Sequence, residues 1–142
     1  MNEVFIEICL NIALSELKAG NLGNGSKFIK MGFGAGSKLK KDKLKVKALK
    51  FLIAASDSGL QIIKIAVSEI IKMQEDMYRE LIRPIIKAIE IAETKDIQKY
   101  YDLQVEEREI VADIVKKITK SDELLPPEIK IKESRLTDYM AT

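Results

Sequence analysis

Apolar residues recur at intervals of three and four along most of this chain, which is the spacing of one face of an α-helix. The first such run predicts a helix over residues 3–19, and Gly20 should end it because glycine is favoured just past a helix C-terminus. A second run predicts a longer helix over residues 60–93. Pro84 should kink or restart that helix because proline lacks an amide hydrogen. Its heptad-like seam, polar at one position, consists of Leu60, Ile63, Val67, Ile70, Gln74, Met77 and Leu81.

A last long helix is predicted over residues 94–120. An aspartate falls in its first turn and lysines fall in its last turn, as the helix dipole favours. Tyr100 and Tyr101 are adjacent and therefore point to different faces of the helix, so at most one of them should be buried. The Pro126-Pro127 pair should end regular helix and leave residues 124–142 as a C-terminal tail.

Two structures fit the pattern of residues 38–55. We favour a helix, because the apolar pattern continues well past the usual length of a strand. In the alternative, residues 43–48 form a strand in which lysines alternate with apolar side chains, and it pairs with 28–31 or 128–132 in a minimal two- or three-stranded sheet. The Ser-Asp-Ser-Gly stretch that follows indicates a break, in which Ser58 should cap the next helix.

The segment from Gly20 to Lys50 differs from the rest of the chain. It holds six of the seven glycines and nine lysines, against a single acid. The glycines predict that residues 20–37 form a long loop, since glycine is the strongest breaker of regular structure. Their spacing does not match a Walker loop or a dinucleotide fingerprint. We therefore expect an all-α fold: a single domain over residues 1–142, with four to five helices and this long Gly/Lys-rich loop.

Charge is distributed unevenly along the chain. The net charge is only +2, but residues 18–50 alone carry ten lysines and one acid. A local excess of positive charge affects which partners a protein binds more than it affects how the protein folds. The chain has no histidine, and Cys9 is its only cysteine, so an intrachain disulfide and a thiolate metal cluster are excluded. With the commonest general base also missing, we expect a protein without enzymatic activity, cofactor or metal.

No stretch of the sequence has the features of a signal peptide or a membrane span. The N-terminal apolar run begins among acids and is too short to cross a bilayer, and charges interrupt the apolar residues 51–71. We therefore expect a cytoplasmic protein without integral membrane association.

The lysines of the segment supply the main functional hypothesis. Ammonium groups neutralise phosphates, and phenylalanine rings interleaved among them can stack on bases, so this composition is typical of single-strand binding. We predict an accessory or structural protein that binds DNA or RNA, as part of a homo-oligomer or a larger complex. The predicted nucleic-acid-binding residues are Lys27, Phe28, Lys30, Phe33, Lys38, Lys40, Lys41, Lys43, Lys45, Lys47 and Lys50.

Other interpretations remain open at this stage. The lysines can equally be a solvated face while the rings pack inward. The chain can also be a protein-interaction or self-assembly module without a nucleic-acid role, docking through the seam of residues 60–81 or through opposite charged poles. The acidic pole consists of Asp102, Glu106, Glu109 and Asp113, which we read as a solvated surface rather than a metal site. Residues 38–55 also have features of a membrane-surface helix, which we place third.

Overall fold

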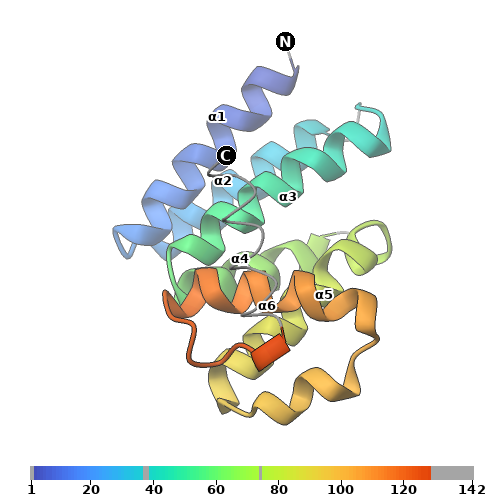
Figure 1. The fold of residues 1–142 in the computed structure, drawn as a ribbon. Coiled ribbons are helices and arrows are strands. Elements are labelled where there is room, and N and C mark those ends of the chain that lie inside the picture. The colour runs from blue at the N-terminus through green and yellow to red at the C-terminus, as the bar shows by residue number, and fades with distance from the viewer. Residues whose placement is uncertain (1, 37–38, 74, 129–142) are drawn as a thin grey trace, which may run out of the picture.

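The computed structural model describes residues 2–36, 39–73 and 75–128, and Figure 1 shows their arrangement. Within these ranges the fold is all-α and contains no strand. Six α-helices and the 3-10 helix η2 occur among the described residues, in the order α1 (Asn2–Lys18), α2 (Leu22–Ala35), α3 (Lys41–Asp57), α4 (Leu60–Met73), α5 (Glu75–Thr94), η2 (Ile97–Asp102) and α6 (Val105–Thr119).

Helices α1 and α2 form an antiparallel hairpin. Their facing residues run in opposite order, since Gly25 of α2 lies against Leu17 and Gly32 lies against Cys9. Gly20, between the two helices, has φ +86°, which confirms its predicted role as the stop of α1. In Figure 1 the hairpin and α3 form the upper part of the molecule, and α4, α5, η2 and α6 form the lower part. One hydrophobic cluster joins these helices, with side chains contributed from each of them.

The prediction that residues 20–37 form a loop is wrong, because residues 22–35 form α2. The buried residues of α2 are Gly25, Ile29, Gly32 and Phe33, and their spacing is helical. A Cβ atom on Gly25 would lie 2.7 Å from Cγ of Leu17, and one on Gly32 would lie 3.2 Å from Cβ of Cys9. These glycines therefore serve the close approach of two helix backbones, and packing against α1 offsets their poor helix propensity.

Helix α3 confirms the helical interpretation of residues 38–55, and the alternative strand over residues 43–48 is wrong because those residues lie inside the helix. The predicted break after it is also present, with φ +108° at Gly59. Ser58, however, does not cap the next helix. Its hydroxyl donates a hydrogen bond to the carbonyl oxygen of Ala54, 2.9 Å away, and so closes α3 instead.

The predicted long helix over residues 60–93 corresponds to α4, which ends at Met73, and α5, which begins at Glu75, with residue 74 outside the described residues. Pro84 sits inside α5. Ile82 and Ile85 are buried on either side of it, so tertiary packing holds the helix across the position where proline removes a backbone hydrogen bond. Buried residues of the predicted seam include Ile63, Val67 and Ile70, which places that seam in the core.

Residues 94–120 form η2 and α6 rather than one long helix. The Asp96 carboxylate accepts a hydrogen bond from the amide of Gln98 at 3.1 Å and so starts η2. The backbone then becomes extended at Gln104, the N-cap of α6. Tyr100 is buried while Tyr101 is 44% exposed, as the sequence predicted for this pair. The Arg108 guanidinium lies 5.3 Å from the centre of the Tyr101 ring and covers it.

Substitution of Gly25 should show that the hairpin depends on backbone proximity. Gly25→Ala places a methyl group against the buried Leu17, so we expect the free energy of unfolding to fall by about 1–3 kcal/mol. Gly34→Ala is the matched control, because no atom lies within 4 Å of its added Cβ. The control should raise stability by up to about 1 kcal/mol through helix propensity. Urea denaturation measures both, and equal effects of the two substitutions would contradict this account.

Tyr100 offers a second test of the core. Its hydroxyl is buried and has no hydrogen-bond partner among the described residues, and burial raises the pKa of the phenol. Tyr100→Phe removes this unpaired group, so urea denaturation should show an unchanged or higher free energy of unfolding, by at most about 1–3 kcal/mol. Tyr100→Ala should instead cost about 3–5 kcal/mol. A clear loss of stability in the phenylalanine variant would mean that the hydroxyl has a stabilising partner.

Candidate interaction surface on helices α1 and α3

Two ion pairs, which we call the ion-pair ladder, join α1 to α3. The Glu3 carboxylate lies 3.2 Å from the ammonium of Lys43. One turn further along both helices, the ammonium of Lys47 donates a hydrogen bond to the Glu7 carboxylate. The two acids and the two lysines are each spaced four residues apart, so they project from matching faces and pair in register. Two of the predicted nucleic-acid-binding lysines are therefore neutralised within the chain.

The ladder changes the electrostatics of α1. The hydrogen bond and the charge of Lys47 lower the pKa of the Glu7 carboxyl, and the charge of Lys50 lowers it further. A carboxylate whose charged form is favoured in this way is a stabilising group at neutral pH rather than a general base. Sequence analysis missed this pairing, although the matched four-residue spacings are visible in the sequence.

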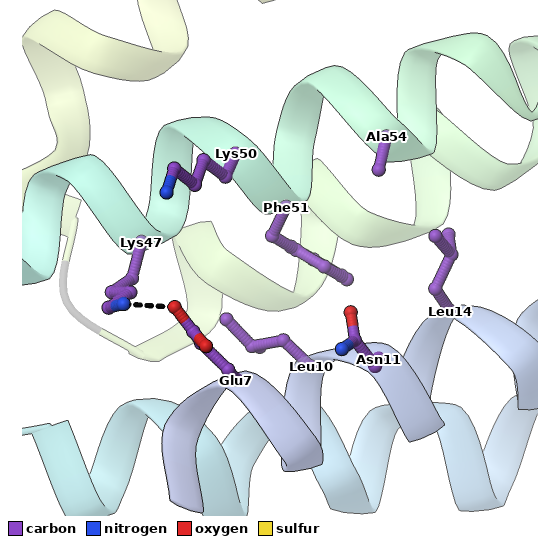
Figure 2. Close-up of a pocket in the computed structure, with 8 residues that line it drawn as sticks. All are labelled: Glu7, Leu10, Asn11, Leu14, Lys47, Lys50, Phe51 and Ala54. Atoms are coloured by element: carbon purple, nitrogen blue, oxygen red, sulfur yellow. Dashed lines mark hydrogen bonds and ion pairs between the residues drawn. The ribbon is translucent and has the colours of Figure 1, made fainter. Parts of the chain in front are cut away.

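A small groove lies beside the ladder, between α1 and α3. Figure 2 shows Leu10 and Asn11 pointing up from α1 and the Phe51 ring pointing down from α3. The cavity volume is about 140 Å³, which is below the range of about 300–1,000 Å³ typical of small-molecule sites. The groove is lined by Glu7, Leu10, Asn11, Leu14, Lys47, Lys50, Phe51 and Ala54. Its residues pack α1 against α3 around a cavity that is smaller than a typical small-molecule site.

The outer face of α3 is apolar, a feature that the sequence analysis did not identify. Val46 is 52%, Leu49 40% and Ile53 36% exposed, and we call these three residues the α3 seam. Their spacing of three and four residues places them on one stripe of the helix. By the same periodicity, Lys43 and Lys50 flank the stripe on the side of α1, and Lys45 flanks it on the other side. The stripe is thus flanked by two lysines on one side and one on the other, and the exposed Asp42 and Asp57 continue its intervals at the two ends.

The remaining predicted residues are distributed over several elements. Lys27 and Lys30 are exposed on α2, which lies behind α1 and α3 in Figure 1. Phe28 is partly buried against the core. Phe33 is buried, with its ring centre 6.3 Å from that of Phe51 in an edge-on contact, so it cannot stack on a base in this conformation. Lys38 lies outside the described residues.

Most lysines of the segment form no ion pair with another described residue. Within the described residues no ion pair involves Lys27, Lys30, Lys40, Lys41, Lys45 or Lys50. Lys40 and Lys41 are exposed at the start of α3, and Lys45 is partly exposed one turn later. These cations remain available to an anionic partner.

The acidic pole is located on η2 and α6. Asp102, Glu106, Glu109 and Asp113 are all exposed there. Among the residues that the structure describes, no group of three or more histidine, cysteine, aspartate or glutamate side chains is arranged to hold a metal ion. In the same residues, no helix has both the length and the apolar character required to cross a membrane.

Comparison of the chain with protein-family models, with curated proteins and with solved structures finds no match. The surface of α1 and α3 must therefore be interpreted from its own geometry and chemistry.

The ion-pair ladder predicts a loss of stability in acid. Because the pKa of Glu7 is lower in the folded chain, its contribution is complete above the ordinary glutamate value of about 4.3 and is lost as the pH falls through the folded value. Glu90, paired with Lys99, contributes in the same direction. Thermal melts from pH 7 to pH 3 should therefore show a decreasing melting temperature, with a smaller decrease in Glu7→Gln.

Glu123→Gln is the control for this titration, because Glu123 is exposed and forms no ion pair within the described residues. Its pH profile should match that of the unmodified chain. A profile for Glu7→Gln that also matches the unmodified chain would show that the ladder does not contribute to stability.

Proposed function

We propose that this chain is a non-enzymatic interaction module that binds an acidic amphipathic helix of a partner protein along the α3 seam. The observation that carries the proposal is the exposed apolar stripe of Val46, Leu49 and Ile53, which lysines flank on both sides. Apolar side chains that are contiguous on a surface and bordered by polar residues often mark an interaction site. A helix laid along α3 would remove the stripe from water.

The chemistry of the partner follows from the flanks of the seam. A partner helix needs apolar side chains at intervals of three and four to bury Val46, Leu49 and Ile53. Carboxylates beside that apolar face would lie opposite Lys45 and Lys50, in the manner of the charged flanks of a coiled coil. These contacts would select the partner and its orientation more than they would add affinity. In the seam of residues 60–81, Ile63, Val67 and Ile70 are buried, so the α3 seam is the better candidate for docking.

Nucleic-acid binding is the second candidate function. It is favoured by the lysines that form no ion pair with another described residue, namely Lys27, Lys30, Lys40, Lys41, Lys45 and Lys50. The burial of Phe33 and the pairing of Lys43 and Lys47 reduce the support for this hypothesis. A phosphate backbone would also leave the α3 seam exposed to water, whereas an amphipathic helix would cover it.

Fluorescence anisotropy with labelled probes distinguishes the two functions. The probes are a heptad peptide with leucines in its seam and glutamates on its flanks, the same peptide with lysines on its flanks, and a single-stranded oligonucleotide. We expect the acidic peptide to bind and the lysine peptide to bind weakly or not at all. The Val46→Ser, Leu49→Ser double variant should weaken acidic-peptide binding at least about tenfold, or about 1.4 kcal/mol.

Ile110→Ser is the matched control, since Ile110 is also exposed but lies on α6. It should leave peptide binding unchanged. Lys45→Gln with Lys50→Gln should weaken peptide binding moderately and reduce its dependence on salt. Binding of the oligonucleotide alone, with a logarithm that falls linearly with the logarithm of salt concentration, would contradict the peptide-binding proposal and establish the second candidate.

A further inference from the structure

The outer face of α1 forms a second exposed apolar surface, which we call the α1 stripe. It consists of Val4, Phe5, Ile8 and Ile12, which are 59%, 45%, 50% and 37% exposed. The opposite face of the same helix carries the core residues Ile6, Leu10, Ala13 and Leu17. α1 therefore has two apolar faces, and its polar side, with Glu3, Glu7 and Lys18, lies between them.

The spacing of the α1 stripe is that of a helix-to-helix contact. Phe5, Ile8 and Ile12 follow intervals of three and four, and the exposed small residues Ser15 and Ala19 continue the same intervals. No member of this series is charged, although Glu16, four residues after Ile12, borders it. Such a seam extends along the 17 residues of α1, or about 25 Å. The α3 seam, by contrast, is flanked by lysines, so the two surfaces are suited to different occupants.

We propose that the α1 stripe pairs with the α1 stripe of a second copy of this chain, antiparallel and with the two-fold axis at Ile12. A neutral seam faces itself without opposing like charges, which an isologous contact requires. The flanks are also complementary. Glu7 and Lys18 lie on the same side of α1, five residues before and six residues after Ile12, so each Lys18 comes level with Glu7 of the other copy.

The charged groups remain available for this contact. Lys18 is exposed and forms no ion pair within the described residues. Lys47 binds Oε1 of Glu7, which leaves the second carboxylate oxygen for Lys18 of the other copy. The dimer would present two α3 seams on one assembly. Its formation does not depend on what binds there, so this inference is independent of the proposed function.

Site-directed disulfide cross-linking of the full chain tests the arrangement. With the two-fold axis at Ile12, Ile12→Cys meets its own copy and should form a covalent dimer under mild oxidation. Phe5→Cys should not cross-link to itself, because the two positions would lie about 21 Å apart along the helix axis, far beyond disulfide reach. A mixture of Phe5→Cys and Ala19→Cys should cross-link, since these positions come level with each other.

Two controls show how much cross-linking arises from random collisions between molecules. The unmodified chain should not cross-link, because Cys9 is buried. Ile110→Cys, exposed on α6, should give no more dimer than random encounter. Self-cross-linking of Phe5→Cys as efficient as that of Ile12→Cys would overturn the antiparallel arrangement.

Sedimentation equilibrium provides the second measurement. The unmodified chain should show a mass that rises with concentration toward the dimer, and Ile8→Lys should remain monomeric with an unchanged helical circular dichroism spectrum. Ile110→Lys should behave as the unmodified chain. A strictly monomeric chain would overturn the proposal. If the Ile12→Cys thiol of that monomer also resists alkylation, residues 129–142 or another part of the same chain would be the occupant of the α1 stripe.

Discussion

The close approach of two helix backbones, at Gly25 and Gly32 of α2, is the constraint on which the rest of this structure depends. Without side chains at these positions, α2 lies directly against Leu17 and Cys9, and α1 is held as one arm of a tight hairpin. α1 in turn positions Glu3 and Glu7 to receive lysines from α3. The place of α3, and with it the orientation of the α3 seam, follows from glycines that are distant from it in sequence.

Charged side chains lie between the two exposed apolar surfaces of the molecule and keep them from forming one continuous apolar patch. The ion-pair ladder and the neighbouring Lys50 lie between the α1 stripe and the α3 seam. One surface is neutral and the other is bordered by cations, so one favours a like surface and the other favours an anionic one. Within the lysine-rich segment, Lys43 and Lys47 stabilise the fold through their ion pairs, whereas Lys40, Lys41 and Lys45 form no ion pair with the described residues.

The sequence was sufficient to predict α1, the helical form of α3 and the break at Gly59. These features depend on local periodicity and on glycines that end helices. The sequence was insufficient to predict α2. Gly25 and Gly32 lie at helical spacing with Ile29 and Phe33, but they carry no apolar side chain, so the segment was interpreted as a loop. The surface could be predicted only in part. Lys47 and Glu7 are 40 residues apart, and no local pattern shows that they meet.

The hairpin of α1 and α2 has a consequence for the order of folding. Its contacts join residues that are close in sequence, and such contacts form faster than those between distant segments. During synthesis the hairpin leaves the ribosome before α3 does. We therefore expect it to be an early folding unit, one whose outer face is already presented while the remainder of the chain is still being translated.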